Sequence, residues 1–256
     1  MKGKNVMKNK ISGKIVALLL TLIIVATSGM PLYAKETGDK ANSFRYENGQ
    51  SIAKAVPFST LSPNAWKKID GKYYSGDGSV IEGAVAKGID VSHHQGTVDW
   101  KKAKEDGVEF AIIRCGFGMN QTKQDDAQWF NNVKGCEENN IPYGVYLYSY
   151  ADTVKKAQSE AEHVLRLIKG HTLAYPVYYD IEEKAVLNKL TAEQLGKIAA
   201  TFVNKVKAEG YQTGIYSNKS NFETFLTDSQ FSQWNKWVAQ YNSAACTYKG
   251  TYQIWQ

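Results

Sequence analysis

Short strand-like segments alternate with amphipathic helical segments from about residue 86 to residue 256. Apolar, β-branched and aromatic residues dominate seven segments: 88–92, 110–115, 143–150, 177–182, 212–217, 236–241 and 251–256. Between the first five segments, apolar residues recur at helical spacing, for example at Ala157, Ala161, Val164, Leu165 and Ile168. This alternation predicts a parallel α/β sheet with helices packed against it.

The predicted helices have recognisable ends. They are expected over 98–106, 126–139, 152–168 and 191–210. Asp99 and Asp152 are candidate N-caps, because a short acidic side chain can accept a hydrogen bond from a free amide of the first turn. Thr191-Ala-Glu-Gln194 has the form of a capping box, and Gly210 is suited to end the helix that this box opens.

The sheet could be an open doubly wound sheet or a closed barrel. A glycine-rich phosphate-binding loop follows none of the strand segments, which argues against a nucleotide-binding fold. A barrel of eight strand–helix units takes about 250 residues, whereas the 44 residues from Thr213 onward are too few for three strands with three full helices. If the sheet closes into a barrel, its second half must lack most of its helices.

The first 85 residues differ from the rest of the chain. Residues 1–34 combine a lysine-rich start, an apolar run over Ile15–Ala26 and a small residue at Ala34, which is the pattern of a cleaved export signal. The apolar run is shorter than the roughly 20 residues that a membrane span needs, and an uncleaved membrane anchor is the alternative. Residues 35–85 are polar, and we expect a linker with a small hairpin at Trp66–Tyr74, which resembles half of an aromatic wall-binding repeat. Residues 86–256 then form the main domain.

Charge and cysteine content narrow the classes of partner. The formal net charge is +6, but residues 1–34 hold five lysines and no acidic residue, which leaves 26 basic against 25 acidic residues. With this balance, the chain has no basic stripe of the kind that binds nucleic acid. Cys115, Cys136 and Cys246 have no metal-site spacing and allow at most one disulfide, so we expect buried thiols and neither a metal nor a cofactor.

The most informative segment is the strand candidate over 177–182. Alternate residues of a strand share a face, which places Val177, Tyr179 and Ile181 under the helices and Tyr178, Asp180 and Glu182 on the inward face. Asp180 and Glu182 lie at the C-terminal end of this strand, where parallel α/β folds place their active sites, and Asp90 lies at the matching end of the first strand. Such a group of acids suits glycoside cleavage, which needs a protonated and an ionised carboxyl group. The structural alternative is an ion-pair cluster with Arg114.

Aromatic residues on neighbouring strands could contact a sugar ring. They are Tyr146, Tyr148, Tyr150, Tyr216, Trp237 and Tyr241. Aromatic faces stack on the C–H faces of sugars, although packing of the barrel interior accounts equally well for about half of such residues. His93 and His94 are expected to point apart on a strand and not to form a metal pair. Glu183, His163 and His171 are expected at the surface.

Several motifs, in this order, resemble glycoside hydrolase family 25, the muramidases also called lysozymes. They are Gly88-Ile-Asp-Val-Ser-His-His-Gln-Gly96, Phe110-Ala-Ile-Ile-Arg114, Ile141-Pro-Tyr-Gly-Val-Tyr-Leu-Tyr-Ser-Tyr150, Tyr179-Asp-Ile-Glu182, Gly214-Ile-Tyr-Ser217 and Trp237-Val-Ala-Gln-Tyr241. The resemblance covers about residues 86–256. It implies a TIM-like α/β barrel with eight strands and about five helices, (β/α)5(β)3.

The resemblance also implies hydrolysis of the β-1,4 bond from N-acetylmuramic acid to N-acetylglucosamine in peptidoglycan glycan strands. It makes Glu182 the general acid, Asp180 its partner carboxylate and Asp90 the family's first-strand acid. Tyr146, Tyr148, Tyr216, Trp237 and Tyr241 are the candidate substrate-binding residues. We expect a bacterial protein that is secreted or associated with the cell wall, monomeric, and without stable membrane contact once the signal is cleaved.

The chain departs from the family pattern at its end. Family members continue past the Trp-Gln of the last strand to a further aspartate, whereas this sequence stops at Gln256. The expectation is therefore either a fragment or an impaired protein. The alternative function is a non-catalytic peptidoglycan-binding protein that kept the groove, and a related glycosidase such as a chitinase is a third hypothesis.

Overall fold

The computed structural model describes residues 46–47, 50–51, 66–75, 77–241 and 245–256. The expected export signal over 1–34 and most of the expected linker over 35–85 lie outside these residues. Among the residues described, no helix combines the length and the hydropathy that crossing a bilayer requires.

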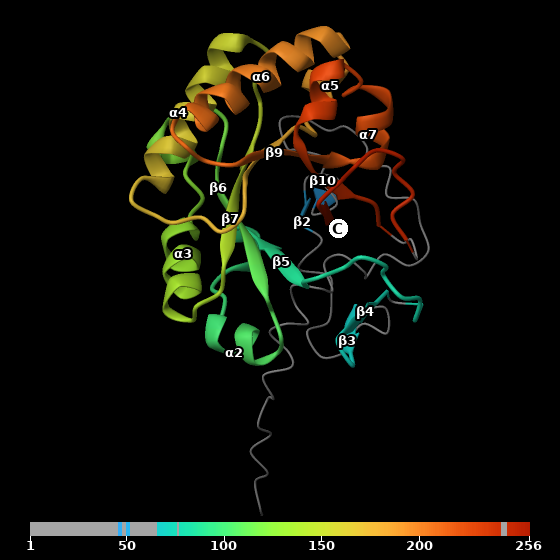
Figure 1. Ribbon diagram of the computed structural model, residues 1–256. Coiled ribbons are helices and arrows are strands. Elements are labelled where there is room, and N and C mark those ends of the chain that lie inside the picture. Colours follow the sequence, from blue (N-terminus) through green and yellow to red (C-terminus); the bar gives the residue numbers. More distant parts are fainter. Residues whose placement is uncertain (1–45, 48–49, 52–65, 76, 242–244) are drawn as a thin grey trace, which may run out of the picture.

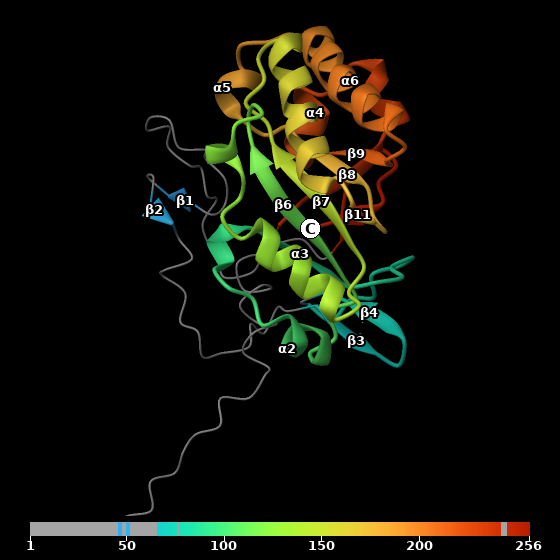
Figure 2. The ribbon, with the colours of Figure 1, turned by 90° about the vertical axis from the view of Figure 1, so that its left-hand side faces the viewer.

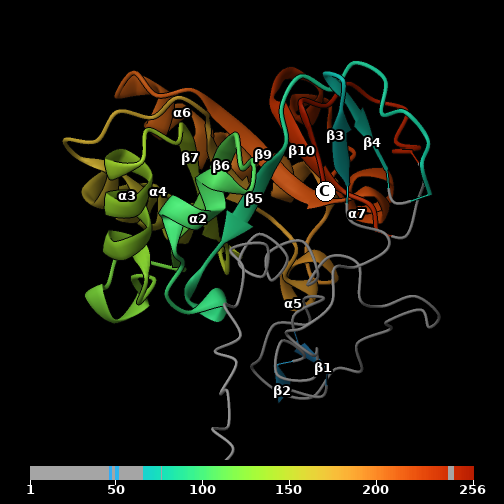
Figure 3. The same ribbon diagram turned by 90° about the horizontal axis from the view of Figure 1, so that it is seen from below.

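A parallel sheet forms the centre of the molecule (Figure 1). Its strands are β5 (Gly88–Val91), β6 (Phe110–Phe117), β7 (Tyr143–Tyr148), β8 (Val177–Asp180), β9 (Thr213–Asn218), β10 (Asn235–Ala239) and β11 (Ile254–Trp255). Each strand pairs in parallel with the next one along the chain. The sheet curls into a half-barrel, which is seen end-on in Figure 3. The predicted α/β class is therefore confirmed, and the described residues supply seven strands where the resemblance implies eight.

Helices and short turns connect the strands, and the longer helices lie against the outer face of the half-barrel (Figure 2). They are η2 (His93–Gln95), α2 (Trp100–Glu105), η3 (Thr122–Gln124), α3 (Trp129–Glu138), α4 (Val154–Ile168), α5 (Lys184–Leu187), α6 (Ala192–Ala208), α7 (Lys219–Thr224) and η4 (Ser229–Gln233). Within the described chain, α7 and η4 are the only helical segments that follow β9. This agrees with the expectation that the second half has few helices.

The helix starts confirm two predicted caps and correct a third. Asp99 accepts a hydrogen bond from the amide of Lys102, and Thr191 forms the expected capping box of α6. Asp152, however, is not the N-cap of α4. Thr153 has the extended backbone of an N-cap and its side chain accepts the amide of Lys156. Asp152 lies one position too early for that bond, and its carboxylate pairs with lysine side chains instead.

The alternation along β8 separates two packed layers. Val177, Tyr179 and Ile181 belong to the large cluster between the sheet and the helices. Tyr178 belongs to a second cluster inside the half-barrel, which we call the inner cluster: Phe110, Ile112, Tyr146, Tyr178, Tyr216, Trp237 and Ala239. Gly214 faces Tyr178 across the register, and a Cβ there would come within 2.5 Å of the tyrosine ring. The glycine therefore leaves space for the inward aromatic side chain.

A small hairpin lies beside the half-barrel. Strands β3 (Lys67–Ile69) and β4 (Lys72–Tyr74) pair antiparallel, and the Asp70-Gly71 turn between them has positive φ at both residues, as a two-residue hairpin requires. Glu109 fastens the hairpin, because its carboxylate accepts hydrogen bonds from Lys68 at 2.5 Å and from Tyr73 at 2.7 Å. A separate antiparallel pair joins β1 (Tyr46–Glu47) to β2 (Gln50–Ser51).

The cysteines are free thiols. Cys115 and Cys136 are buried, as expected, whereas Cys246 is partly exposed. Burial raises the pKa of the Cys115 thiol far above its ordinary value, which keeps it protonated. These thiols act as small apolar groups of the core.

Candidate active site

Asp180 is the last residue of β8 and is only 2% exposed, whereas Glu182 lies two residues beyond and is partly exposed. The backbone around them is fixed from both neighbouring strands: the Ser149 amide donates to the Asp180 carbonyl at 3.0 Å, and the Ile181 amide donates to the Tyr216 carbonyl at 3.0 Å. One carboxylate thus lies at the C-terminal end of a central strand and the other two residues beyond it; the strand ends at Asp180, two residues earlier than the predicted end at residue 182.

Tyr148 and Tyr216 flank Asp180 in the register of β7 and β9. Burial raises the pKa of both phenols well above its ordinary value, and charges of neighbouring groups, among them Glu182 and Asp180, act in the same direction. The two hydroxyls therefore stay neutral and can donate hydrogen bonds beside the acids. Tyr148 donates to Glu183 at 3.2 Å.

The aromatic residues expected to bind sugar lie at different depths. Trp237 is at the centre of the inner cluster, with its ring centroid 5.7 Å from that of Tyr146 and 4.4 Å from that of Tyr216. Tyr146 and Trp237 are each 3% exposed and pack inside the half-barrel. Tyr241 is partly exposed and lies 3.3 Å from Tyr216, hydroxyl to hydroxyl. Phe117, Tyr148 and Tyr150 form a second group, the aromatic rim, with centroid distances of 5.1 Å for Tyr148–Tyr150 and 6.4 Å for Phe117–Tyr150.

Asp90 is held across the open side of the half-barrel. It is partly exposed on β5, one edge strand of the sheet, and its Oδ2 accepts a hydrogen bond from Nε2 of Gln256, which follows the other edge strand, β11. The two edges of the sheet are therefore joined at this point by a side-chain contact.

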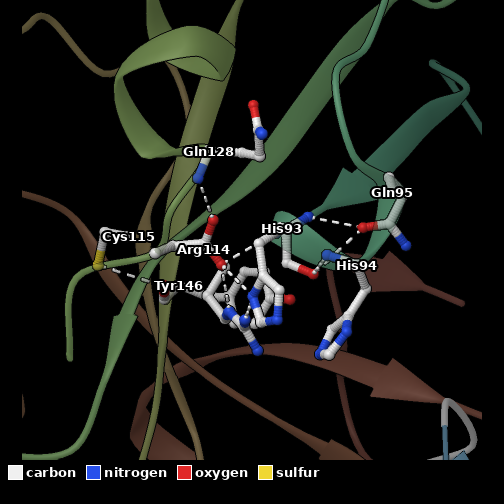
Figure 4. Close-up of polar contacts among 9 residues, drawn as sticks. His93, His94, Gln95, Arg114, Cys115, Gln128 and Tyr146 are labelled. Atoms are coloured by element: carbon white, nitrogen blue, oxygen red, sulfur yellow. Dashed lines mark hydrogen bonds and ion pairs between the residues drawn. The ribbon is translucent and has the colours of Figure 1, made fainter. Parts of the chain in front are cut away.

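Arg114 of β6 and Asp126, which lies just before α3, form a buried ion pair next to the turn η2 (Figure 4). Arg114 donates through Nε to Asp126 at 2.7 Å and also contacts the His93 ring. The amides of His93 and Gln128 donate to the same carboxylate at 3.0 and 2.9 Å. Burial would raise the pKa of Asp126, but the hydrogen bonds from His93 and the charge of Arg114 outweigh it and hold that pKa well below its usual range. Arg114 is therefore paired with Asp126, a residue that the sequence did not single out.

Two expectations about histidines are wrong. His93 and His94 lie in the turn η2, with ring centroids 4.0 Å apart, because β5 ends at Val91 and Ser92 caps the turn. No cluster of His, Cys, Asp and Glu suited to a metal is found among the described residues. His163 is completely buried, since it lies on the face of α4 that packs against β6. Its ring contacts the Gly118 carbonyl at 2.9 Å and Asp125 at 2.8 Å, which secures the loop after β6.

His171 and Glu183 are partly exposed.

Glu160 is a second buried acid that was not singled out from the sequence. It lies on α4 and is completely buried behind β8. Its only sequence signal is its position on the apolar face of the helix, next to Ala161 and three residues before His163. A polar residue at such a position predicts a buried hydrogen-bond network.

The sequence of this chain also matches a known protein family. The model of the glycosyl hydrolases family 25 matches residues 89–256. The autolytic lysozyme of Clostridium acetobutylicum is 28% identical over 155 residues, which cover 60% of this chain and 45% of that protein.

Solved structures show the same similarity. The modular autolysin LytC from Streptococcus pneumoniae is 31% identical with a TM-score of 0.64, and the match covers 75% of this chain and 47% of that one. LytC has also been solved with a synthetic peptidoglycan ligand. A family 25 glycosyl hydrolase from Bacillus anthracis, at 20% identity and a TM-score of 0.58, shares the fold over 66% of this chain and 77% of that one. This chain spans about half the length of the autolytic lysozyme and of LytC. Because the family model matches well over half of its residues, the chain belongs to glycosyl hydrolase family 25.

Proposed function

We propose that this chain is a secreted bacterial N-acetylmuramidase that hydrolyses the β-1,4 bond between N-acetylmuramic acid and N-acetylglucosamine in peptidoglycan. The observation that carries the proposal is the pair Asp180 and Glu182 at the C-terminal end of β8, beside the neutral hydroxyls of Tyr148 and Tyr216. Family membership and similarity to an autolytic lysozyme and to LytC support the choice of substrate.

Glu182 is the general acid in this proposal. Its partial exposure beyond the strand end lets it reach the glycosidic oxygen, to which it donates a proton as the C1–O bond breaks. Asp180 is buried and held by its backbone, so it acts as a fixed negative charge. It stabilises the positive charge that develops on the sugar ring and orients the substrate's N-acetyl group.

The carbonyl oxygen of the N-acetyl group attacks C1 and forms a five-membered ring intermediate. Glu182, now ionised, removes a proton from the water that opens this ring, which restores the acid and gives net retention at C1. Asp90 contributes a further carboxylate, the partly exposed Tyr241 contacts the sugar, and Tyr148 and Tyr216 present their neutral hydroxyls beside the acids. Tyr146 and Trp237 support these residues from the inner cluster.

Replacement of the general acid tests the proposal. Glu182→Gln keeps the shape of the side chain but removes its proton, so release of soluble fragments from purified walls should fall by about 10²–10⁴-fold. Binding to walls and the folded state should be retained. Glu193→Gln, an exposed acid on α6, is the matched control and should keep full activity. If the parent chain and Glu182→Gln clear walls equally fast, Glu182 is not the general acid. If the parent chain and the variant both bind walls but neither clears them, the non-catalytic alternative holds.

A further inference from the structure

A carboxyl group is completely buried behind the strand that ends at Asp180. Glu160 Oε1 accepts a hydrogen bond from the Tyr150 amide at 2.9 Å. Its Oε2 accepts two more, from the Ser149 hydroxyl at 2.8 Å and from the Tyr179 hydroxyl at 2.5 Å. Three donors directed at one carboxyl group are the arrangement that satisfies its ionised form, because a carboxylate has only acceptors.

The three donors come from the two strand ends that frame the candidate active site. Ser149 and Tyr150 directly follow β7, and the Ser149 amide also donates to the Asp180 carbonyl. Tyr179 directly precedes Asp180 in β8, and its ring stacks on Phe202 of α6 at a centroid distance of 4.0 Å. Glu160 therefore connects α4 to the backbone directly after β7 and to the side chain next to Asp180.

Tyr150 carries this connection to the substrate side of the sheet. It is partly exposed and belongs to the aromatic rim with Tyr148 and Phe117. Burial, and then the charge of Glu183, raises its pKa to about 12, so its hydroxyl stays neutral. A shift of the Tyr150 backbone would move an aromatic ring at the entrance to the carboxylates.

Both protonation states of Glu160 are accessible near neutral pH. Burial raises its pKa to about 7, although the hydrogen bonds from Tyr179, Tyr150 and Ser149 act in the opposite direction. When the carboxyl group gains a proton, it must donate that proton to a neighbouring oxygen. The hydroxyls of Tyr179 and Ser149 lie 2.9 Å apart and can reorient to accept it. The proton then lies on Oε2, and Oε1 continues to accept the Tyr150 amide as a neutral carbonyl oxygen, which is a weaker acceptor than a carboxylate oxygen.

The surroundings of Glu160 contain few other charges. Lys156, one turn earlier on α4, acts to lower its pKa and is paired with Asp152. On the β6 side, α4 presents His163, which is paired with Asp125. On the α6 side, the neighbouring ring is the uncharged Phe202.

We propose that Glu160 is a positioning residue for the candidate active site: its ionised carboxylate holds Tyr150 and the end of β8 in place, and protonation weakens its hold on Tyr150. The consequence for catalysis rests on the proposed function, whereas the response of the Tyr150 amide does not. Retaining a buried carboxyl group whose ionisation opposes folding is a pattern typical of functional sites.

The test follows the Tyr150 amide by ¹⁵N-tyrosine NMR as pH is varied, with the signal assigned from Tyr150→Phe. In the parent chain the amide shift should titrate with a midpoint near 7. Glu160→Gln should abolish this titration. Tyr179→Phe removes a bond that lowers the pKa of Glu160, so the midpoint should rise by about 1 unit or more. Tyr143→Phe is the matched control, because it removes a tyrosine-to-glutamate bond of 2.7 Å elsewhere on β7 and should leave the midpoint unchanged.

The same variants are then assayed for wall cleavage against pH. The kcat/KM profile of the parent chain should fall below the same midpoint, lose that inflection in Glu160→Gln, and shift with the amide in Tyr179→Phe. A Tyr150 amide that does not titrate within about two units of pH 7 overturns the proposal whatever the activity. An amide titration without a matching inflection in kcat/KM overturns the positioning role. An amide titration in a chain that cleaves no walls at any pH instead overturns the proposed function.

Discussion

Arg114 and Asp126 form a buried ion pair next to the candidate site. Both side chains are almost completely removed from water, at 8% and 0% exposure. A buried pair of this kind adds little net stability relative to apolar residues, but removal of one partner leaves the other charge uncompensated. The pair also fixes η2 and the start of α3, because Asp126 accepts the amides of His93 and Gln128.

Asp126→Asn should therefore destabilise the folded chain by about 3–5 kcal/mol at neutral pH. The pKa of Asp126 is lower in the folded than in the unfolded chain, so its contribution exists above the ordinary value of 3.8 and is lost as pH falls through the folded value. The difference between parent and variant should accordingly shrink in acid. Urea unfolding at several pH values measures it. Glu138→Gln, which removes an exposed ion pair with Lys134, is the control and should cost less than about 1 kcal/mol. Equal losses in the two variants would contradict this account.

At the scale of elements, the hairpin β3–β4 is held mainly through one residue. Glu109 accepts hydrogen bonds from Lys68, Tyr73 and the Lys87 amide. Burial would raise the pKa of Glu109, but these bonds outweigh it and lower that pKa to about 2. A ring contact of 4.6 Å between Trp66 and Trp255 adds a second attachment, to the last strand. The hairpin therefore packs on the end of the half-barrel opposite to the carboxylates.

Glu109→Gln should loosen the hairpin without unfolding the sheet. Its surface bonds are worth only about 1 kcal/mol, so global stability should change little. Proteolysis between residues 66 and 85 should become faster, while cleavage of the rest of the chain should not. Glu105→Gln, an exposed acid at the end of α2, should leave both rates unchanged. If the hairpin is as resistant in Glu109→Gln as in the parent, the attachment lies elsewhere.

The elements show what a sequence can and cannot reveal. Period and capping predicted the seven strands of the sheet, the helices α2, α3, α4 and α6, and the two faces of β8, because those signals are local; the short helices α5 and α7 were not predicted. Asp152 was assigned the role of Thr153, since both residue types cap helices and only the backbone angles separate them. Asp126 and Glu160 were missed because their partners are distant in sequence: Arg114 and His93 for one, Tyr179 and Ser149 for the other.

At the scale of the whole molecule, the half-barrel brings the C-terminal ends of the central strands together, while its two edge strands are not paired with each other. The edges β5 and β11 meet through the side chains of Asp90 and Gln256, with no backbone pairing between them in the described sheet. The helices cover the first half of the barrel and leave the second half thinly covered (Figure 2). The fold thus presents the ends of β7, β8 and β9 as one surface, on which the proposed function places the glycan strand.

The proposed action on cell walls also requires export. The apolar run Ile15–Ala26 and the small residue Ala34 predict cleavage before Lys35. Expression of the full chain in a bacterial host, followed by N-terminal sequencing of the protein in the medium and wall fraction, should find Lys35 as the first residue. Recovery of the chain with an intact Met1 in the membrane fraction would show an uncleaved anchor instead.

The identity of the new reducing end tests the central claim most directly. Purified peptidoglycan is digested with the chain, the products are reduced with borohydride, and the reduced sugars are identified by mass spectrometry. A muramidase breaks the bond on the N-acetylmuramic acid side, so reduced N-acetylmuramic acid should appear with the parent chain and be nearly absent with Glu182→Gln. Reduced N-acetylglucosamine as the sole new end would contradict the account.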